Sequence, residues 1–431
     1  MNESTGSGIT LINLFKNFPR ENLAAIGFED HTRLCSLKAC PRVYQAGSRE
    51  RKILFPFNIF ARKDIFSGPI TQKETRGYPS LPAFRITIYG LTRMLSKEMA
   101  DIIGVMPIMK RFHISAEMDQ WIREYNPDVV YSLLASMPNI KLTEEIADKY
   151  GLPIAVHVLD DWPAVINKPG LMYYYWNRQY KRTLNRIFGK AKLLLGISEG
   201  MRDEYKKKYG KEFIPFHNPI DTGLWSATRK KNLSIEDEAS IVYLGSINNN
   251  NSSALRDVSK AVHELNQSGH KVKFDIYSFQ HKTLQARKLK HWQGVNLLPP
   301  AQYHEIPQLV SKYDFALLAL NFNHRSLKYT RLSFSTKASE YMASGIPTII
   351  YASKHAEYSR HALKYGWAYA ITERGVDNIK RSLLKLINNE DLRQKISNRA
   401  VKYSEENCDT RQVASAFLDS FTKLINKNSL V

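Results

Sequence analysis

The chain has 431 residues, more than one ordinary hydrophobic core accommodates, and this length favours two α/β domains of about 200 residues each. Apolar residues make up 43% and charged residues 24%, a globular composition that excludes extensive disorder. The sequence has no run of about 20 apolar residues, as a membrane-spanning helix requires, and no basic-then-apolar leader follows Met1. We therefore expect a protein that is neither exported nor membrane-spanning.

The net charge is strongly positive, with 62 Lys and Arg against 41 Asp and Glu, or +21. Such a charge favours an anionic partner: a membrane surface, a nucleic acid or a phosphorylated substrate. A basic solvated surface without a role is the alternative. The three cysteines, Cys35, Cys40 and Cys408, have no paired CxxC spacing, so neither a disulfide framework nor a zinc site is expected. A reducing, cytoplasmic compartment fits this cysteine content.

The chain opens with STGSGITLINLFKNFP from Ser4, which predicts a glycine-rich turn followed by a helix. In a doubly wound domain such a turn follows the first strand, yet only residues 1–3 precede it. Either that strand is missing or another segment fills the centre of the sheet. Gly6 and Gly8 are candidates for close backbone approach to a ligand. A plain helix entry is the other interpretation.

Short apolar runs alternate with helical patterns, which is typical of βα repeats that build parallel sheets covered on both faces. In the first half the runs are ILFPF from Ile53, VVYSLLA from Val129, IAVHVL from Ile154 and LLLGIS from Leu193. Amphipathic stretches such as IKLTEEIADKY separate them. We therefore predict strands joined by crossover helices.

The segment HVLDDWP, residues 157–163, lies at the carboxyl end of a predicted strand, where open α/β sheets bind ligands. Asp161 is the first candidate for aligning or stabilising the reacting groups, followed by Asp160 and His157. The structural alternative has an aspartate capping the next helix and His157 in the core. Asp160 and Asp161 are adjacent and lack D-x-D spacing, so no metal site is expected.

Periodicity breaks at FIPFHNPIDTGLW, residues 213–225, and we place the domain boundary there. The βα rhythm then restarts with IVYLGS from Ile241, VKFDIYS from Val272, VNLL from Val295, FALLAL from Phe315 and PTIIYA from Pro347. After Ile371 the pattern is helical, and residues 413–425 read as a closing amphipathic helix. We expect domains at residues 1–218 and 219–405, and a C-terminal helix over 406–431 that packs back toward the N-terminal domain.

The most informative segment is SFSTKASEYMASGIPTIIYA, residues 333–352. Ser335 or Thr336 is predicted to cap a helix that Gly345 ends. The start of this helix favours phosphate, because its free amides and dipole attract negative charge. Lys337 works against the dipole there, which an anionic ligand would explain. Glu340, on the same face, is suited to accept hydrogen bonds from ribose hydroxyls. The alternative is a solvent-facing ion pair.

This segment resembles the donor-binding motif of the retaining family 4 glycosyltransferases, glycosyl transferases group 1, written P-x-K-x-x-E-Y-M-A-x-G-x-P or as an E-x7-E pair. The resemblance implies the GT-B fold: α/β, with two doubly wound Rossmann-like domains facing a central cleft. It implies that the N-terminal domain binds the acceptor and the C-terminal domain the nucleotide sugar. Lys337 would contact the donor phosphate and Glu340 the ribose.

Two positions depart from this motif. Ser335 replaces the usual proline, and Leu332 replaces the first glutamate, so that the chain lacks the usual sugar contact. We expect backbone amides in the loop from residues 322 to 334, with His324, Arg325 and Arg331, to supply a replacement.

Other segments resemble the same family in the same order. STGSGITL, residues 4–11, is similar to its first N-domain loop, which makes Gly6 and Gly8 candidates for approach to the acceptor or the leaving phosphate. PFHNPID is similar to its inter-domain passage at Asn218 and Asp221. IVYLGSI is similar to its first C-domain strand and glycine turn, which makes Gly245 and Ser246 diphosphate-binding candidates. The family often places an arginine and a lysine soon after this glycine, whereas here NNNNSS intervenes and Arg256 is the nearest basic residue.

We therefore predict an enzyme that moves a hexosyl group from a nucleotide sugar to an acceptor hydroxyl, with retention, in polysaccharide or glycolipid synthesis. The expected partners are a nucleotide-sugar donor and a saccharide or lipid-linked acceptor, with an anionic inner-membrane surface as a candidate and no nucleic acid. No cofactor or metal is expected. The alternatives are a sugar-nucleotide epimerase of the same fold and a non-catalytic binding protein.

Overall fold

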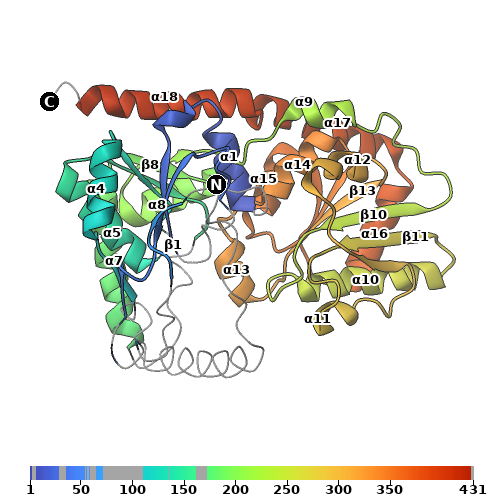
Figure 1. Ribbon diagram of the computed structural model, residues 1–431. Helices are drawn as coiled ribbons and strands as arrows, with labels where there is room; N and C mark the ends of the chain where they lie inside the picture. Colours follow the sequence, from blue (N-terminus) through green and yellow to red (C-terminus); the bar gives the residue numbers. More distant parts are fainter. Residues whose placement is uncertain are drawn as a thin grey trace. The chain divides into compact units, whose positions relative to one another are not determined.

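The computed structural model describes residues 1, 6–28, 35–53, 55, 58, 65–70, 110–134, 136–161 and 172–428. The chain divides into two compact units (Figure 1). Unit 1 comprises Met1–Pro215 and Ser415–Val431, and unit 2 comprises Phe216–Ala414. Among the described residues, no helix is both long and apolar enough to cross a bilayer.

Nine strands of unit 1 fall into three sheets in the described part of the chain. One has the order β1-β2-β4, a second pairs β3 with β5, and the third, all parallel, has the order β6-β7-β8-β9. Their bounds are β1 (Ala24–Phe28), β2 (Arg42–Ala46), β3 (Arg51–Ile53), β4 (Gly68–Pro69), β5 (Lys110–Phe112), β6 (Val130–Ser132), β7 (Ile154–Val158), β8 (Leu193–Gly196) and β9 (Ile214–Pro215).

Three of the four runs predicted as strands in the first half form β6, β7 and β8. The run from Ile53 does not start a parallel strand, because Ile53 ends β3, which pairs antiparallel with β5; residues 54, 56 and 57 lie outside the described residues. Strands β1 and β2 pair in parallel and were not predicted. Within the described part, no strand joins β1 to β6.

The helices of unit 1 begin and end at residues suited to those positions. Ser136 and Ser198 cap α5 and α8, and Gly151 and Gly210 end them in the left-handed conformation. The helices are α1 (Gly6–Leu14), α4 (Ala116–Tyr125), α5 (Met137–Tyr150), α7 (Tyr173–Lys190) and α8 (Glu199–Tyr209), with a 3-10 turn, η1 (Arg20–Asn22).

The last helix, α18 (Thr410–Asn428), contributes its residues from Ser415 onward to unit 1 (red in Figure 1). Phe417 and Phe421 pack against Phe15, with ring centroids 5.1 and 6.1 Å apart, and against Tyr131 of β6. The helix thus completes an aromatic core that α1 and the central sheet begin.

Unit 2 is built on one parallel sheet with the order β12-β11-β10-β13-β14-β15. Counted from β10, this is 3-2-1-4-5-6, the doubly wound Rossmann order. The strands are β10 (Ala239–Leu244), β11 (Val272–Tyr277), β12 (Val295–Leu298), β13 (Phe315–Ala319), β14 (Thr348–Tyr351) and β15 (Ala368–Ile371). The five strands predicted in this half are all present, and β15 is an addition.

Helices cover this sheet, and the core between them consists of side chains such as Ile241, Phe274 and Leu317, all at most 1% exposed. The helices are α9 (Thr222–Ala227), α10 (Ser252–Gln267), α11 (Leu284–Arg287), α12 (Ile306–Val310), α13 (His324–Thr330), α14 (Thr336–Ser344), α15 (Glu357–Tyr365), α16 (Val376–Ile387) and α17 (Glu390–Asn407), with a 3-10 turn, η4 (Tyr303–Glu305).

Candidate functional site

The strand order of unit 2 selects one place for a ligand. The chain leaves β10 toward β11 on one side and β13 toward β14 on the other, although β10 and β13 are hydrogen-bonded neighbours. In doubly wound sheets ligands bind at the carboxyl ends of such a strand pair, where the diverging connections leave a crevice. Here those ends carry Gly245 after β10 and Asn321 after β13.

Helix α14 begins at this edge, because it connects two parallel strands, β13 and β14, and runs back against them. Ser335 is its N-cap and accepts a hydrogen bond from the Lys337 amide at 3.3 Å, and Gly345 ends the helix at φ +73°. The predicted cap and stop are confirmed. Among the described residues no acceptor bonds the Thr336 amide, which leaves a donor and the positive end of the dipole for an anion.

Two hydrogen bonds from distant segments fix the position of α14. The Leu244 amide at the end of β10 donates to Tyr341 Oη at 3.1 Å. Asn218 Nδ2 donates to the Phe334 carbonyl, just before the cap, at 2.8 Å. Asn218 and Tyr341 therefore hold the helix start against the end of β10 within unit 2.

Gly245 and Lys337 lie against each other at this edge. Gly245 has φ +154°, and a Cβ atom there would sit 3.2 Å from Lys337 Cε and 3.2 Å from Tyr243 Oη. A side chain would therefore be strained and would crowd the lysine. The Lys337 side chain is half-buried and forms no ion pair or hydrogen bond with any described residue. An unpaired cation at a helix start is suited to a phosphate.

Glu340 lies one turn further along α14. It is 6% exposed, and no described residue donates a hydrogen bond to its carboxyl. Burial raises the pKa of Glu340 to about 7, while the charge of Lys337 acts in the opposite direction. A buried carboxylate without a partner is costly in free energy. Paired hydroxyl donors from a ligand would remove that cost.

At the start of the neighbouring helix α10, by contrast, asparagine side chains form hydrogen bonds with the first turn and the preceding loop. Asn321, 3% exposed, accepts hydrogen bonds from the Ala254 amide at 2.9 Å and Ser253 Oγ at 2.8 Å, and its Nδ2 donates to the Asn249 carbonyl at 2.8 Å. The Asn251 Nδ2 donates to Tyr243 Oη and the Ser246 carbonyl, both at 2.8 Å. The asparagine run thus forms an ordered turn, and Asn248 and Asn321 accept hydrogen bonds from the Ser252 and Ala254 amides at the start of α10.

The other candidates in unit 2 are less favourably placed. Ser246 is exposed, and its Oγ accepts a hydrogen bond from Asn248 Nδ2 at 3.1 Å. Arg256 is exposed on α10, and within the described chain no contact joins it to α14. Gly245, Thr336, Lys337 and Glu340 are the candidates that the fold assembles at one edge.

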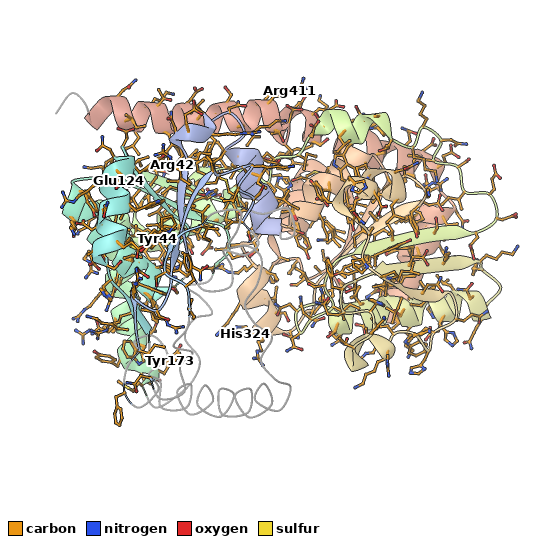
Figure 2. All side chains as sticks on the ribbon, in the orientation of Figure 1. Arg42, Tyr44, Glu124, Tyr173, His324 and Arg411 are labelled. Atoms are coloured by element: carbon orange, nitrogen blue, oxygen red, sulfur yellow. The ribbon has the colours of Figure 1, made fainter. Side chains whose placement is uncertain are left out.

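The expected replacement loop is wrong in its secondary structure. Residues 324–330 form helix α13, capped by Asn323, whose side chain accepts from the Ser326 amide at 2.8 Å. The amides of residues 326–331 bond within this helix or to its cap, so they are not available to replace the missing glutamate. His324 and Arg325 are exposed on its first turn (His324 in Figure 2), and Leu332 is 1% exposed.

Tyr303 is a candidate that sequence reasoning missed. It follows the carboxyl end of β12 in turn η4, and it is 36% exposed. Burial raises the pKa of the Tyr303 hydroxyl, and the charges of Glu340 and Asp221 raise it further, so this hydroxyl lies within electrostatic range of the Glu340 carboxyl. An exposed aromatic ring at this edge offers a stacking face for a nucleobase.

In unit 1 the candidate catalytic residues lie at and after the end of β7. His157 is fully buried, its Nδ1 lies 2.8 Å from Tyr131 Oη, and burial lowers its pKa to about 3, so the ring is neutral. Its Nε2 has no partner among the described residues. Asp161 is 4% exposed and accepts a hydrogen bond from Tyr205 Oη at 2.9 Å. Asp160 alone of the three is exposed.

The glycines of the opening segment lie in α1. Gly6 is its first residue and is exposed, whereas Gly8 is buried. Residues 2–5 of the expected turn lie outside the described residues.

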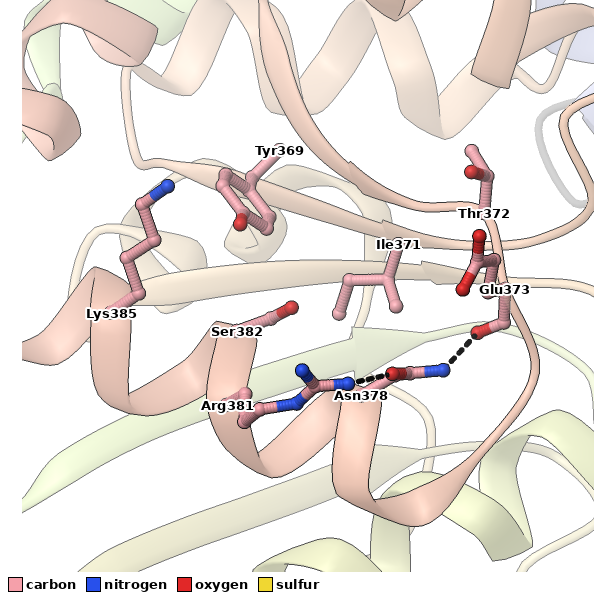
Figure 3. Close-up of a pocket in the computed structure, with 8 residues that line it drawn as sticks. All are labelled: Tyr369, Ile371, Thr372, Glu373, Asn378, Arg381, Ser382 and Lys385. Carbon is pink, nitrogen blue, oxygen red and sulfur yellow. Dashed lines mark hydrogen bonds between the residues drawn. The ribbon is translucent and has the colours of Figure 1, made fainter.

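The described chain has no group of three or more His, Cys, Asp or Glu side chains placed to hold a metal. A cavity of about 280 Å³ lies elsewhere in unit 2, between β15 and α16 (Figure 3). Asn378 there accepts a hydrogen bond from Arg381 (dashed in Figure 3). None of its lining residues belongs to the α14 site.

Comparisons with known proteins agree with this geometry. Residues 238–389, which include β10 to β15 and all of α14, match the model of the family described as "Glycosyl transferases group 1". The resemblance to glycosyl transferases group 1 is thereby confirmed for this segment. No curated protein matches the chain.

Solved structures of other proteins share this fold. Anabaena HepE in complex with UDP and glucose has a TM-score of 0.60 at 12% identity, covering 98% of this chain and 97% of its own. Sucrose-phosphate synthase from Thermosynechococcus elongatus has a TM-score of 0.55 at 8% identity, covering 72% and 77%. A glycosyltransferase from Rickettsia africae has a TM-score of 0.53 at 12% identity, covering 72% and 79%. The chain has the GT-B fold, as predicted.

Proposed function

We propose that the protein transfers a hexosyl group from a nucleotide-sugar donor to an acceptor hydroxyl, with retention of the anomeric configuration. One observation carries this proposal: the start of α14 combines an open amide, an unpaired lysine and a buried, unpaired carboxylate within two turns. The match to group 1 glycosyl transferases over the same residues supports it. So do the complexes of Anabaena HepE with UDP and glucose and with UDP-glucose.

In this proposal the donor diphosphate lies on the Thr336 amide and Lys337 Nζ, beside Gly245. The bond between the anomeric carbon and the phosphate oxygen breaks, and the acceptor oxygen bonds to that carbon from the same face. The acceptor proton passes to the leaving phosphate. Negative charge grows on the diphosphate as its bond breaks, and prealigned positive groups stabilise that charge most strongly in the transition state.

Glu340 would bind the two ribose hydroxyls, which supply the donors that its carboxylate lacks. Because burial raises its pKa to about 7, the carboxylate form dominates only above neutrality. The nucleotide would therefore bind the ionised form of Glu340, which burial makes unfavourable in free energy in the protein without ligand.

We propose that unit 1 binds a saccharide or lipid-linked acceptor. Among the three candidates at the end of β7, Asp160 is exposed, whereas buried Asp161 and His157 are better suited to position the end of that strand. Gly6 and Gly8 would allow close approach to α1. We place the reaction in the cytoplasm, in the synthesis of a polysaccharide or glycolipid. Lys337 would neutralise the diphosphate in place of a bound metal ion.

The test is an assay of the full chain with a panel of nucleotide sugars and saccharide acceptors. It follows nucleoside diphosphate release, product mass and the anomeric signal by NMR. We expect release coupled to a product with the anomer of the donor. Isomerised donor formed without an acceptor would indicate an epimerase, an option that buried Leu332 leaves open. Saturable nucleotide binding without turnover would indicate a binding protein.

A further inference from the structure

Helix α7 of unit 1 has a face that the described fold does not use. Its inner face is buried through Trp176, Tyr180, Leu184 and Ile187, and it packs beside α5 (Figure 1). The opposite face is exposed along the helix. An 18-residue amphipathic helix therefore presents a continuous outer surface.

The charges of α7 all have one sign. Its sequence YYYWNRQYKRTLNRIFGK contains five basic residues and no acidic residue. Arg186 and Lys190 pair with Glu144 and Asp148 of α5 at 2.6 and 2.8 Å. The other three, Arg178, Lys181 and Arg182, are exposed and pair with no carboxylate of the described chain.

Two exposed tyrosines precede these cations. Tyr174 is 84% exposed and Tyr175 is 52% exposed, and they follow Tyr173, at the first turn of the helix (Figure 2). Side chains three and four positions apart share one face of a helix. Tyr174 and Tyr175 therefore line up with Arg178, which lines up with Lys181 and Arg182. We call these five residues the α7 stripe.

We propose that the α7 stripe docks on an anionic lipid surface, with the tyrosines in the headgroup region and the cations on lipid phosphates. Tyrosine rings prefer that interface, and each basic residue close to an anionic bilayer adds to attraction. The net charge of +21 acts in the same direction. Nucleic acid is the other polyanion, but no nucleic-acid motif accompanies these residues. This inference does not depend on the proposed transferase activity.

The test is cosedimentation of the full chain with two kinds of vesicle: phosphatidylcholine alone, and phosphatidylglycerol with phosphatidylcholine in equal parts. Three variants are compared: Arg178→Ala/Lys181→Ala/Arg182→Ala, Tyr174→Ser/Tyr175→Ser, and a control, Arg287→Ala/Lys288→Ala/Lys290→Ala. The control removes three exposed, unpaired cations of unit 2. All changed side chains are exposed, and thermal unfolding checks that each variant folds.

We expect binding to anionic vesicles only, weakened by salt. Loss of the three α7 cations should reduce partitioning roughly a hundredfold, loss of the tyrosines should reduce it less, and the control should bind as the unchanged chain does. The proposal fails if anionic vesicles do not bind, or if the control loses as much binding as the α7 variant. It also fails if single-stranded nucleic acid, and not vesicles, responds to the α7 change.

Discussion

Lys337 occupies a position that helix electrostatics disfavour, because a cation in the first turn faces the positive end of the dipole. It is also unpaired among the described residues and lies against Gly245. Glu340, on the same face, lacks a hydrogen-bond donor. Each residue alone destabilises the empty site, and a nucleotide diphosphate with its ribose satisfies both.

We predict that Lys337→Ala lowers kcat/KM roughly a hundredfold to a thousandfold, since one preorganised charge on the leaving group is lost. Thermal unfolding should show an intact fold, because the side chain makes no ion pair or hydrogen bond within the described chain. Lys395→Ala, an exposed change on α17, is the matched control. Near-normal transfer by Lys337→Ala would remove this lysine from the site.

The raised pKa of Glu340 has a consequence for stability. The folded state holds its proton up to about pH 7, whereas an ordinary glutamate loses it near 4.5. Glu340 therefore costs no stability below about pH 4.5, and its cost grows as pH rises to about 7. We predict that Glu340→Gln is more stable than the unchanged chain at pH 8, by up to about 3 kcal/mol.

Urea unfolding at pH 4.5 and pH 8 measures this difference, which should nearly vanish at the lower pH. An equal effect of Glu340→Gln at both values would contradict a buried, unpaired carboxylate. The same variant should bind nucleotide more weakly at pH 8, because an amide replaces the acceptor of the ribose hydroxyls.

At the residue scale, sequence reasoning was most accurate where the chemistry is local. Ser335, Lys337 and Glu340 share one helix, so their relation follows from helical spacing. Asn321 and Tyr303 were missed, because their contacts join segments far apart in the chain. No spacing rule brings Asn321 to Ala254 before the strand order is known.

The two helices that begin at the ligand edge of unit 2 differ in the side chains at their first turns. Helix α10 has its Ala254 amide bonded to Asn321 and its turn ordered by Asn251. Helix α14 keeps the Thr336 amide open, with Lys337 beside it. The difference explains why Arg256, on α10, is the weaker candidate despite the resemblance.

We predict that Asn321→Ala lowers the free energy of unfolding by about 2 kcal/mol, because it removes a buried side chain that bridges two loops. The measurement is urea unfolding, with Asn398→Ala, an exposed change on α17, as the control. Nucleotide affinity should fall with stability, since the loop carrying Gly245 loosens. Unchanged stability would show that the bridge is not formed in solution.

Among the elements, α14 and its cap were predicted because Ser335 and Gly345 are strong local signals. Helix α13 was taken for a loop, since seven residues give too little periodicity to recognise. Strand β15 was missed for a similar reason, as Ala368–Ile371 is short and three of its four residues are only half-buried.

At the scale of the whole molecule, alternating apolar runs predicted parallel α/β sheets, because the rhythm of βα units is a property of the sequence as a whole, and the family resemblance implied the GT-B fold. Right-handed crossovers restrict the possible strand orders of unit 2, but more than one doubly wound order obeys this rule. The division of unit 1 into three sheets was not predictable, since β1 and β2 are short and lack a strong apolar pattern.

The most direct measurement of the central claim is a crystal structure of the protein with UDP. We predict the diphosphate within hydrogen-bonding distance of the Thr336 amide and Lys337 Nζ, and the ribose hydroxyls on Glu340. A nucleotide bound elsewhere, with the start of α14 unoccupied, would contradict the account.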